Sequence, residues 1–157
     1  MTHGLVIVLW LVVCAVQDMR QRQIANGLTL GGGLLALVYV LWTGSTWMGA
    51  PAADGGWSFA LALLLTLPGY AMGRFGAGDV KLLSSLALAS NADYLLGTLI
   101  GAGIPLGAWA LLAPRVGSLM SQRLRAHLCS PASHASTKQP FAPFVLTGFA
   151  ACWYWIH

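Results

Sequence analysis

Two of the four acidic residues in this chain lie where long apolar stretches meet polar segments. Asp18 ends the first apolar stretch and Asp79 lies between two later ones, and the sequence contains no glutamate. A carboxylate at the edge of the hydrocarbon layer of a membrane is costly, so an aspartate placed there is a candidate functional residue. The other two acids, Asp54 and Asp93, are expected to be solvated residues of outer turns.

Two carboxylates at comparable depth could hydrolyse a peptide bond together. Amide hydrolysis needs an activated water and a proton for the leaving nitrogen. A close aspartate pair can supply both, because one carboxyl holds a proton while the other acts as a base. Such a pair titrates as a unit, so the proton is assigned to neither residue. The sequence therefore predicts an intramembrane aspartic protease with Asp18 and Asp79 as its catalytic residues.

The glycines before Asp79 support this interpretation. Gly76 and Gly78 allow unusual backbone angles and the close approach of another chain. A substrate must unfold locally to expose its peptide bond, and a glycine-rich turn beside the acid leaves room for it. The GxGD string alone is weak, because the chain contains 19 glycines. It gains weight from a second membrane-edge aspartate on the same side.

The composition indicates one polytopic membrane domain that covers residues 1–157. Hydrophobic residues make up 57% of the chain and charged residues 8%, whereas a soluble domain carries about 25% charged residues. We expect an all-α fold of about six transmembrane helices, although several stretches are shorter than the ~20 residues of a typical span. The predicted helices cover residues 3–17, 26–42, 57–73, 79–91, 94–113 and 140–156.

The basic residues predict the orientation of these helices. With six spans, all eight fall on one side of the membrane, and the positive-inside rule makes that side cytoplasmic. Both termini are then outside, in the periplasm, and both aspartates lie at the cytoplasmic edge. This clustering favours a topological role over nucleic-acid binding, despite the net charge of +4. The eight residues are Arg20, Arg22, Arg74, Lys81, Arg115, Arg123, Arg125 and Lys138.

The basic cytoplasmic loop at about 114–139 has two open interpretations, an amphipathic helix on the anionic inner leaflet or an irregular loop. The three cysteines contain no CxxC pair, so neither a disulfide framework nor a structural zinc site is expected. Trp10 and Trp109 are expected to be packing residues. Five further tryptophans are expected to mark the outer interface: Trp42, Trp47, Trp57, Trp153 and Trp155.

Three stretches resemble the motifs of the type IV prepilin peptidase family. Asp18 to Asn26 (DMRQRQIAN) resembles the first motif, although Ala25 replaces the usual proline. Gly76 to Leu83 (GAGDVKLL) closely resembles the GxGDxK box, which is the most specific match. Pro140 to Phe144 (PFAPF) resembles the opening of the family's last helix.

The resemblance implies an aspartic endopeptidase of the bacterial inner membrane, with Asp18 and Asp79 at the catalytic positions. Such an enzyme removes the short basic leader of prepilins or pseudopilins at the cytoplasmic face. This chain lacks the cysteine-rich zinc region of the larger members. It therefore resembles the short, peptidase-only type found with tight-adherence pilus systems. We expect no methyltransferase activity, no metal and no cofactor.

Supporting residues and rival functions stay open at this level. Lys81 either tunes an aspartate or holds substrate, or it is a snorkelling lysine that fixes helix depth. Asn26 is a candidate N-cap of the second helix. Alternative functions are a small membrane transporter or a non-catalytic pilus or secretion assembly subunit. A transporter site usually lies near the bilayer midplane, whereas both acids are predicted at one edge.

Overall fold

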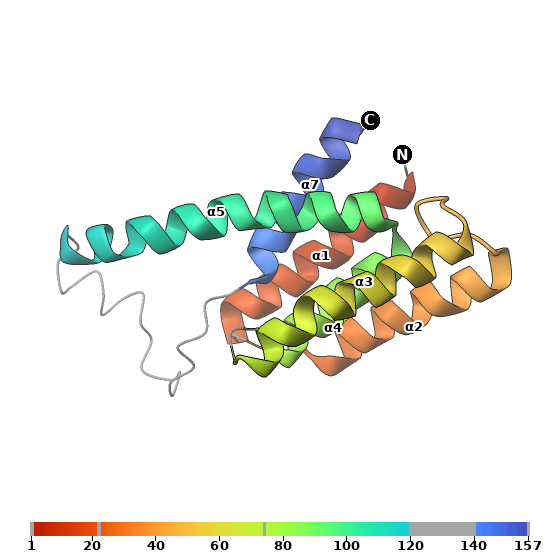
Figure 1. The fold of residues 1–157 in the computed structure, drawn as a ribbon, viewed down its shortest axis with the longest axis horizontal. Coiled ribbons are helices and arrows are strands. Elements are labelled where there is room, and N and C mark those ends of the chain that lie inside the picture. The colour runs from red at the N-terminus through yellow and green to blue at the C-terminus, as the bar shows by residue number, and fades with distance from the viewer. Residues whose placement is uncertain (1, 22, 74, 120–140, 157) are drawn as a thin grey trace.

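The computed structural model describes residues 2–21, 23–73, 75–119 and 141–156. These residues form six helices (Figure 1). The fold is thus all-α, as predicted. The helices are α1 (Thr2–Gln21), α2 (Asn26–Thr43), α3 (Ala52–Ala71), α4 (Ala77–Ala89), α5 (Ala92–Leu119) and α7 (Ala142–Ile156).

Helix α4 is the short central element of the bundle. Its 13 residues are packed against α2 and α3, and every residue from Leu82 to Ala87 is buried. Helices α5 and α7 pack closely on each other, and α7 also packs on α1. Helix α4 buries residues on several sides because it packs against more than one neighbouring helix.

The outer surface of the bundle is apolar. Large hydrophobic side chains of α2, such as Leu34 and Leu41, are exposed, as are Leu64 and Ile100 on other helices. Two segments, His3–Gln21 and Asn26–Thr43, are long and apolar enough to cross a membrane, and 92–108 and 142–156 are shorter apolar segments. An exterior of this kind fits a helical membrane protein. The number of spans and the side of each terminus stay predictions.

The candidate site residues gather at one end of the bundle. Figure 1 shows the C-terminal ends of α1 and α3 and the N-terminal ends of α2, α4 and α7 on the same side of the molecule. Asp18 is in the last turn of α1 and Asp79 in the first turn of α4. The basic residues Arg20 and Lys81 lie close to these acids in the same two helices.

Several helix bounds differ from the prediction. Helix α1 continues to Gln21, so Asp18 lies within the helix instead of following it. Asp54 and Asp93 were expected in turns, which is wrong, because they are exposed residues in the first turns of α3 and α5. A negative charge is favourable there because it faces the positive end of the helix dipole. Residues 114–119 continue α5, and the remainder of the predicted loop lies outside the described residues.

The tryptophans divide into two groups. Trp42, Trp57 and Trp155 are 88%, 76% and 89% exposed, as expected for residues that face an interface. Trp47 and Trp153 are only partly exposed and pack against the core, and their place at the outer interface stays a prediction. The Trp47 ring stacks obliquely on Tyr39, and the Trp153 ring covers Gly4.

Trp10 is a packing residue, as predicted. Its Nε1 donates a hydrogen bond to the carbonyl oxygen of Leu28 at 3.1 Å, and its ring lies against Gly32. This contact ties α1 to α2.

Candidate active site

Asp18 is buried at the contact between α1 and α7. Its side chain is 5% exposed, and its Oδ2 accepts a hydrogen bond from the backbone N–H of Ala142 at 3.0 Å. Ala142 is the first residue of α7, where backbone N–H groups have no partner within the helix. The Asp18 carboxylate therefore caps a helix that lies more than 100 residues away in the sequence.

The sequence of α1 explains why Asp18 points inward. Leu11, Cys14 and Ala15 are buried, and Asp18 follows them at the same helical spacing. Val12 and Val16, on other faces, are exposed. The aspartate thus ends the face of α1 that packs into the molecule.

Asp79 is held by the turn that precedes α4. Its Oδ2 accepts a hydrogen bond from the backbone N–H of Gly76 at 3.0 Å, and its own N–H donates to the Gly76 carbonyl oxygen at 3.1 Å. The residue is half-buried and occupies the third position of the helix. A carboxylate is stabilised at this place by the helix N-terminus.

Gly76 matters for its small size and not for unusual backbone angles. Gly76 has φ −79° and ψ 151°, which is extended backbone open to any residue, so that part of the prediction is wrong. A Cβ atom on Gly76 would lie 3.0 Å from Oδ2 of Asp79. Gly78 lies against Ile24, where a Cβ atom would make an ordinary contact at 3.7 Å.

A hydrogen bond joins the segment after Asp18 to the helix of Asp79. Lys81 Nζ donates to Oδ1 of Asn26 at 2.8 Å. Asn26 is the first residue of α2, and Ala25 is its N-cap residue, so the prediction that Asn26 caps this helix is wrong. Its side chain instead ties α2 to α4. The Lys81 ammonium is thus used in a contact between the two motifs.

A second contact joins the two motifs through α7. The rings of Phe75 and Phe141 meet edge to face with centroids 5.3 Å apart. Phe75 precedes the turn of Asp79, and Phe141 precedes Ala142, which binds Asp18. Phe75, Phe141 and Ala142 were not predicted as site residues. For Phe141 and Ala142 a signal was present, since both belong to the PFAPF stretch, which was interpreted only as the opening of a helix.

Ser85 fixes the contact between α2 and α4 one turn further along. Its hydroxyl oxygen lies 2.8 Å from the carbonyl oxygens of both Thr29 and Lys81, and it donates its proton to them. A Cβ atom on Gly33 would lie 2.6 Å from this hydroxyl, so the two helices meet closely. The start of α2 and the start of α4 therefore contact each other in the same order along both segments. Ile24 lies against Gly78, Asn26 bonds to Lys81, and Thr29 bonds to Ser85.

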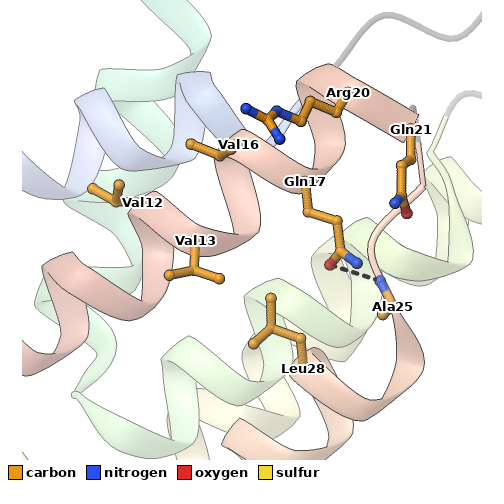
Figure 2. Close-up of a pocket in the computed structure, with 8 residues that line it drawn as sticks. All are labelled: Val12, Val13, Val16, Gln17, Arg20, Gln21, Ala25 and Leu28. Atoms are coloured by element: carbon orange, nitrogen blue, oxygen red, sulfur yellow. Dashed lines mark hydrogen bonds between the residues drawn. The ribbon is translucent and has the colours of Figure 1, made fainter.

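A groove opens beside Asp18 on another face of α1 (Figure 2). It has a volume of about 470 Å³ and lies between α1 and α2. Val12, Val13 and Leu28 make it apolar, and Gln17 and Arg20 lie toward its polar end. The side-chain oxygen of Gln17 accepts a hydrogen bond from the Ala25 N–H at 3.1 Å, which closes the loop after α1.

One end of the bundle thus offers two carboxylates, those of Asp18 and Asp79, and each of them accepts a hydrogen bond from a backbone N–H group. Within the described ranges, no group of three or more His, Cys, Asp or Glu side chains could hold a metal ion. Cys14 and Cys152 are free thiols in those ranges, and Cys129 lies outside them.

Most of the chain is similar to a known protein family. Residues 5–111 match the model of the type IV leader peptidase family. The match includes Asp18 and Asp79 and all of their contacts described above except those with α7. Comparison with curated proteins and with solved structures gives no match.

Proposed function

Because this chain belongs to the type IV leader peptidase family, we propose that it is an aspartic endopeptidase of the bacterial inner membrane. Its substrates are type IV prepilins or pseudopilins, and it removes their short basic leader at the cytoplasmic face. The observation that carries this proposal is the direct contact between the two segments that bear the aspartates. Ile24 and Asn26 contact Gly78 and Lys81 at the end of the bundle where both acids lie.

In the proposed mechanism, Asp18 and Asp79 share one proton. The ionised carboxylate takes a proton from a water molecule, and the water oxygen attacks the carbonyl carbon of the scissile bond. The protonated carboxyl gives its proton to the leaving nitrogen as the C–N bond breaks. The products are a new carboxyl group and a new amino terminus. Backbone N–H groups from Ala142 and Gly76 orient the two side chains for these steps.

Co-expression with prepilins from the same genome tests the proposal. We expect a leader-sized mobility shift with the wild-type chain. Asp18→Asn and Asp79→Asn should each lower the cleavage rate by at least about 100-fold, because either change removes a proton-transfer group. Asp93→Asn is a matched control, because Asp93 is an exposed aspartate in the first turn of α5.

The readout is electrophoretic mobility of the pilin, with equal membrane levels of each variant checked by immunoblotting. Near wild-type cleavage by either Asp18→Asn or Asp79→Asn would overturn the two-aspartate mechanism. Cleavage that falls equally in Asp93→Asn would show that the assay reports general damage to the fold.

A further inference from the structure

The groove between α1 and α2 has apolar walls and a polar end (Figure 2). The exposed side chains of Val12, Val13 and Val16 follow one another along α1, and Leu28 of α2 lies opposite Val13. Its volume of about 470 Å³ is in the range of sites that bind small molecules. The walls favour an occupant with a hydrocarbon part, because apolar surface gains free energy when it leaves water.

Two hydrogen bonds between α1 and the start of α2 frame the groove. The Trp10 Nε1 group donates to the carbonyl oxygen of Leu28, and the Ala25 N–H donates to the side-chain oxygen of Gln17, each at 3.1 Å. Apart from these bonds, α1 and α2 make few contacts with each other. The groove is therefore a fixed feature of the way these two helices are joined.

The polar end of the groove offers hydrogen-bond donors and a positive charge. The side-chain oxygen of Gln17 is occupied by the Ala25 N–H, so its NH2 group is the part left to bind a ligand. Arg20 is exposed, and its guanidinium carries only donors. Figure 2 shows the Arg20 side chain extending along α1 toward Val16, above the apolar wall. This end is thus suited to an anion.

No negative charge opposes an anion in the groove. The described residues that line it include no acid. The nearest acid in the sequence, Asp18, is on another face of α1 and is buried there against Ala142. A ligand with a negative group at one end and a hydrocarbon chain at the other therefore matches both parts of the groove.

We propose that this groove binds a phospholipid with a negatively charged headgroup. The phosphate binds Arg20, whose planar guanidinium can donate two parallel hydrogen bonds to it, and an acyl chain lies along Val13 and Leu28. Basic pockets between helices at the cytoplasmic surface of a membrane bind lipids of this class. A zwitterionic headgroup fits less well, because its ammonium finds no acid in the lining. The lipid site is independent of the proposed peptidase function.

Charge and shape separate this occupant from two others. The leader of the proposed substrates is basic, so Arg20 would repel it. Inorganic phosphate could bind Arg20, but it would leave the apolar walls uncovered. Only an anionic lipid uses the charge and the walls together.

The first experiment measures lipid binding to the purified protein in detergent by native mass spectrometry, without substrate. Phosphatidylglycerol and phosphatidylcholine with identical acyl chains differ only in the headgroup. Phosphatidylglycerol should bind with a Kd about fivefold lower, which is the effect of one basic residue on an anionic lipid. Arg20→Gln should remove this preference. Arg115→Gln, a matched loss of charge in α5, should keep it.

Equal affinity of the wild type for both lipids, or an unchanged preference in Arg20→Gln, would overturn the proposal. Inorganic phosphate at the same concentration as phosphatidylglycerol should not displace it. Displacement under these conditions would identify a site for free anions instead.

A second pair of variants tests the apolar wall. Val13→Trp puts a large ring into the groove and should raise the Kd of phosphatidylglycerol by at least about fivefold, because it displaces part of the acyl chain. Leu9→Trp is the control, since Leu9 is exposed one helical turn earlier on α1 and is not among the lining residues. Equal Kd values for the two variants would contradict a lipid chain in this groove.

The third experiment identifies the occupant in the native membrane. A photo-crosslinking amino acid at Val13 should give phospholipid adducts that are enriched in anionic headgroups relative to the whole membrane. The same crosslinker at Leu9 should give adducts that match the membrane composition. Adducts of Val13 with a pilin or with a second copy of this chain, in place of lipid, would overturn the proposal.

Discussion

At the residue scale, both candidate catalytic side chains are held by backbone amides. Asp18 accepts from Ala142, and Asp79 accepts from Gly76, each at 3.0 Å. A backbone donor cannot rotate away as a side chain can, so each carboxylate has a fixed orientation. The small size of Gly76 is part of this arrangement, since a Cβ atom there would crowd the Asp79 carboxylate.

Gly76→Ala should lower kcat by roughly ten- to 100-fold, because a small displacement of a catalytic group has a large effect on rate. Gly78→Ala should have a smaller effect, because its Cβ would meet its nearest neighbour, in Ile24, at 3.7 Å. Single-turnover cleavage of saturating prepilin measures both. Equal rates in the two variants would show that crowding of the Asp79 carboxylate is unimportant.

The hydrogen bond between Lys81 and Asn26 makes a second prediction at this scale. Lys81→Met and Asn26→Leu should each lower kcat/KM by about fivefold, which corresponds to one hydrogen bond. The double variant should be no worse than either single one, because both remove the same contact. Lys81→Arg, which keeps a donor, should recover part of the activity. Additive losses in the double variant would argue that Lys81 acts independently of Asn26.

At the element scale, α7 connects the Asp18 contact to the packing of the bundle. Its first residue donates to Asp18, and its middle packs on α5 at a crossing of two glycines. A Cβ atom on Gly101 would lie 2.8 Å from the Cα atom of Gly148. Small residues at such a crossing allow the two backbones to approach closely. The position of α7, and with it the Asp18 hydrogen bond, therefore depends on this crossing.

Gly148→Val should destabilise the protein by about 1–3 kcal/mol, because the new side chain overpacks the crossing. Its Cβ atom would lie 2.7 Å from the backbone nitrogen of Ala102. We also expect slower cleavage, since α7 must shift away from α5. Gly103→Val is the control, because Gly103 of α5 has open space around it. Thermal unfolding in detergent measures the stability, and a Gly148→Val protein as stable as wild type would contradict the prediction.

At the scale of the whole molecule, the bundle combines an apolar exterior with one polar end. The exposed leucines and valines of α1 and α2 suit a lipid environment. The polar end carries Arg20, Lys81 and both candidate catalytic acids. We propose that this end faces the cytoplasm, since basic residues favour that side of the membrane. The leader of a substrate would then be cut on the side where it is made.

Reporter fusions test this orientation. Alkaline phosphatase, which is active only outside the cytoplasm, should be active when fused after His157. It should be inactive when fused after Lys138, which lies in the predicted cytoplasmic loop. A fluorescent protein that matures only in the cytoplasm should give the reverse pattern at the same two positions. An active phosphatase after Lys138 would show that the predicted topology is wrong.

The sequence by itself determined the class of fold, the approximate helices and the family. These follow from local properties, namely long apolar stretches, their polar ends and the GAGDVKLL and DMRQRQIAN motifs. It also identified Asp18 and Asp79 as candidates, because an acid beside an apolar stretch stands out without any knowledge of packing. The catalytic role of these residues stays a prediction.

Only the tertiary structure decided which partners these residues have. The bonds from Ala142 to Asp18 and from Lys81 to Asn26 span 124 and 55 residues, and no local pattern predicts them. The misjudged role of Asn26 shows the reason. An asparagine at the start of a helix fits a cap locally, but the nearby Lys81 ammonium offers a donor that exists only once α4 has packed against α2. The groove between α1 and α2 likewise arises from packing alone.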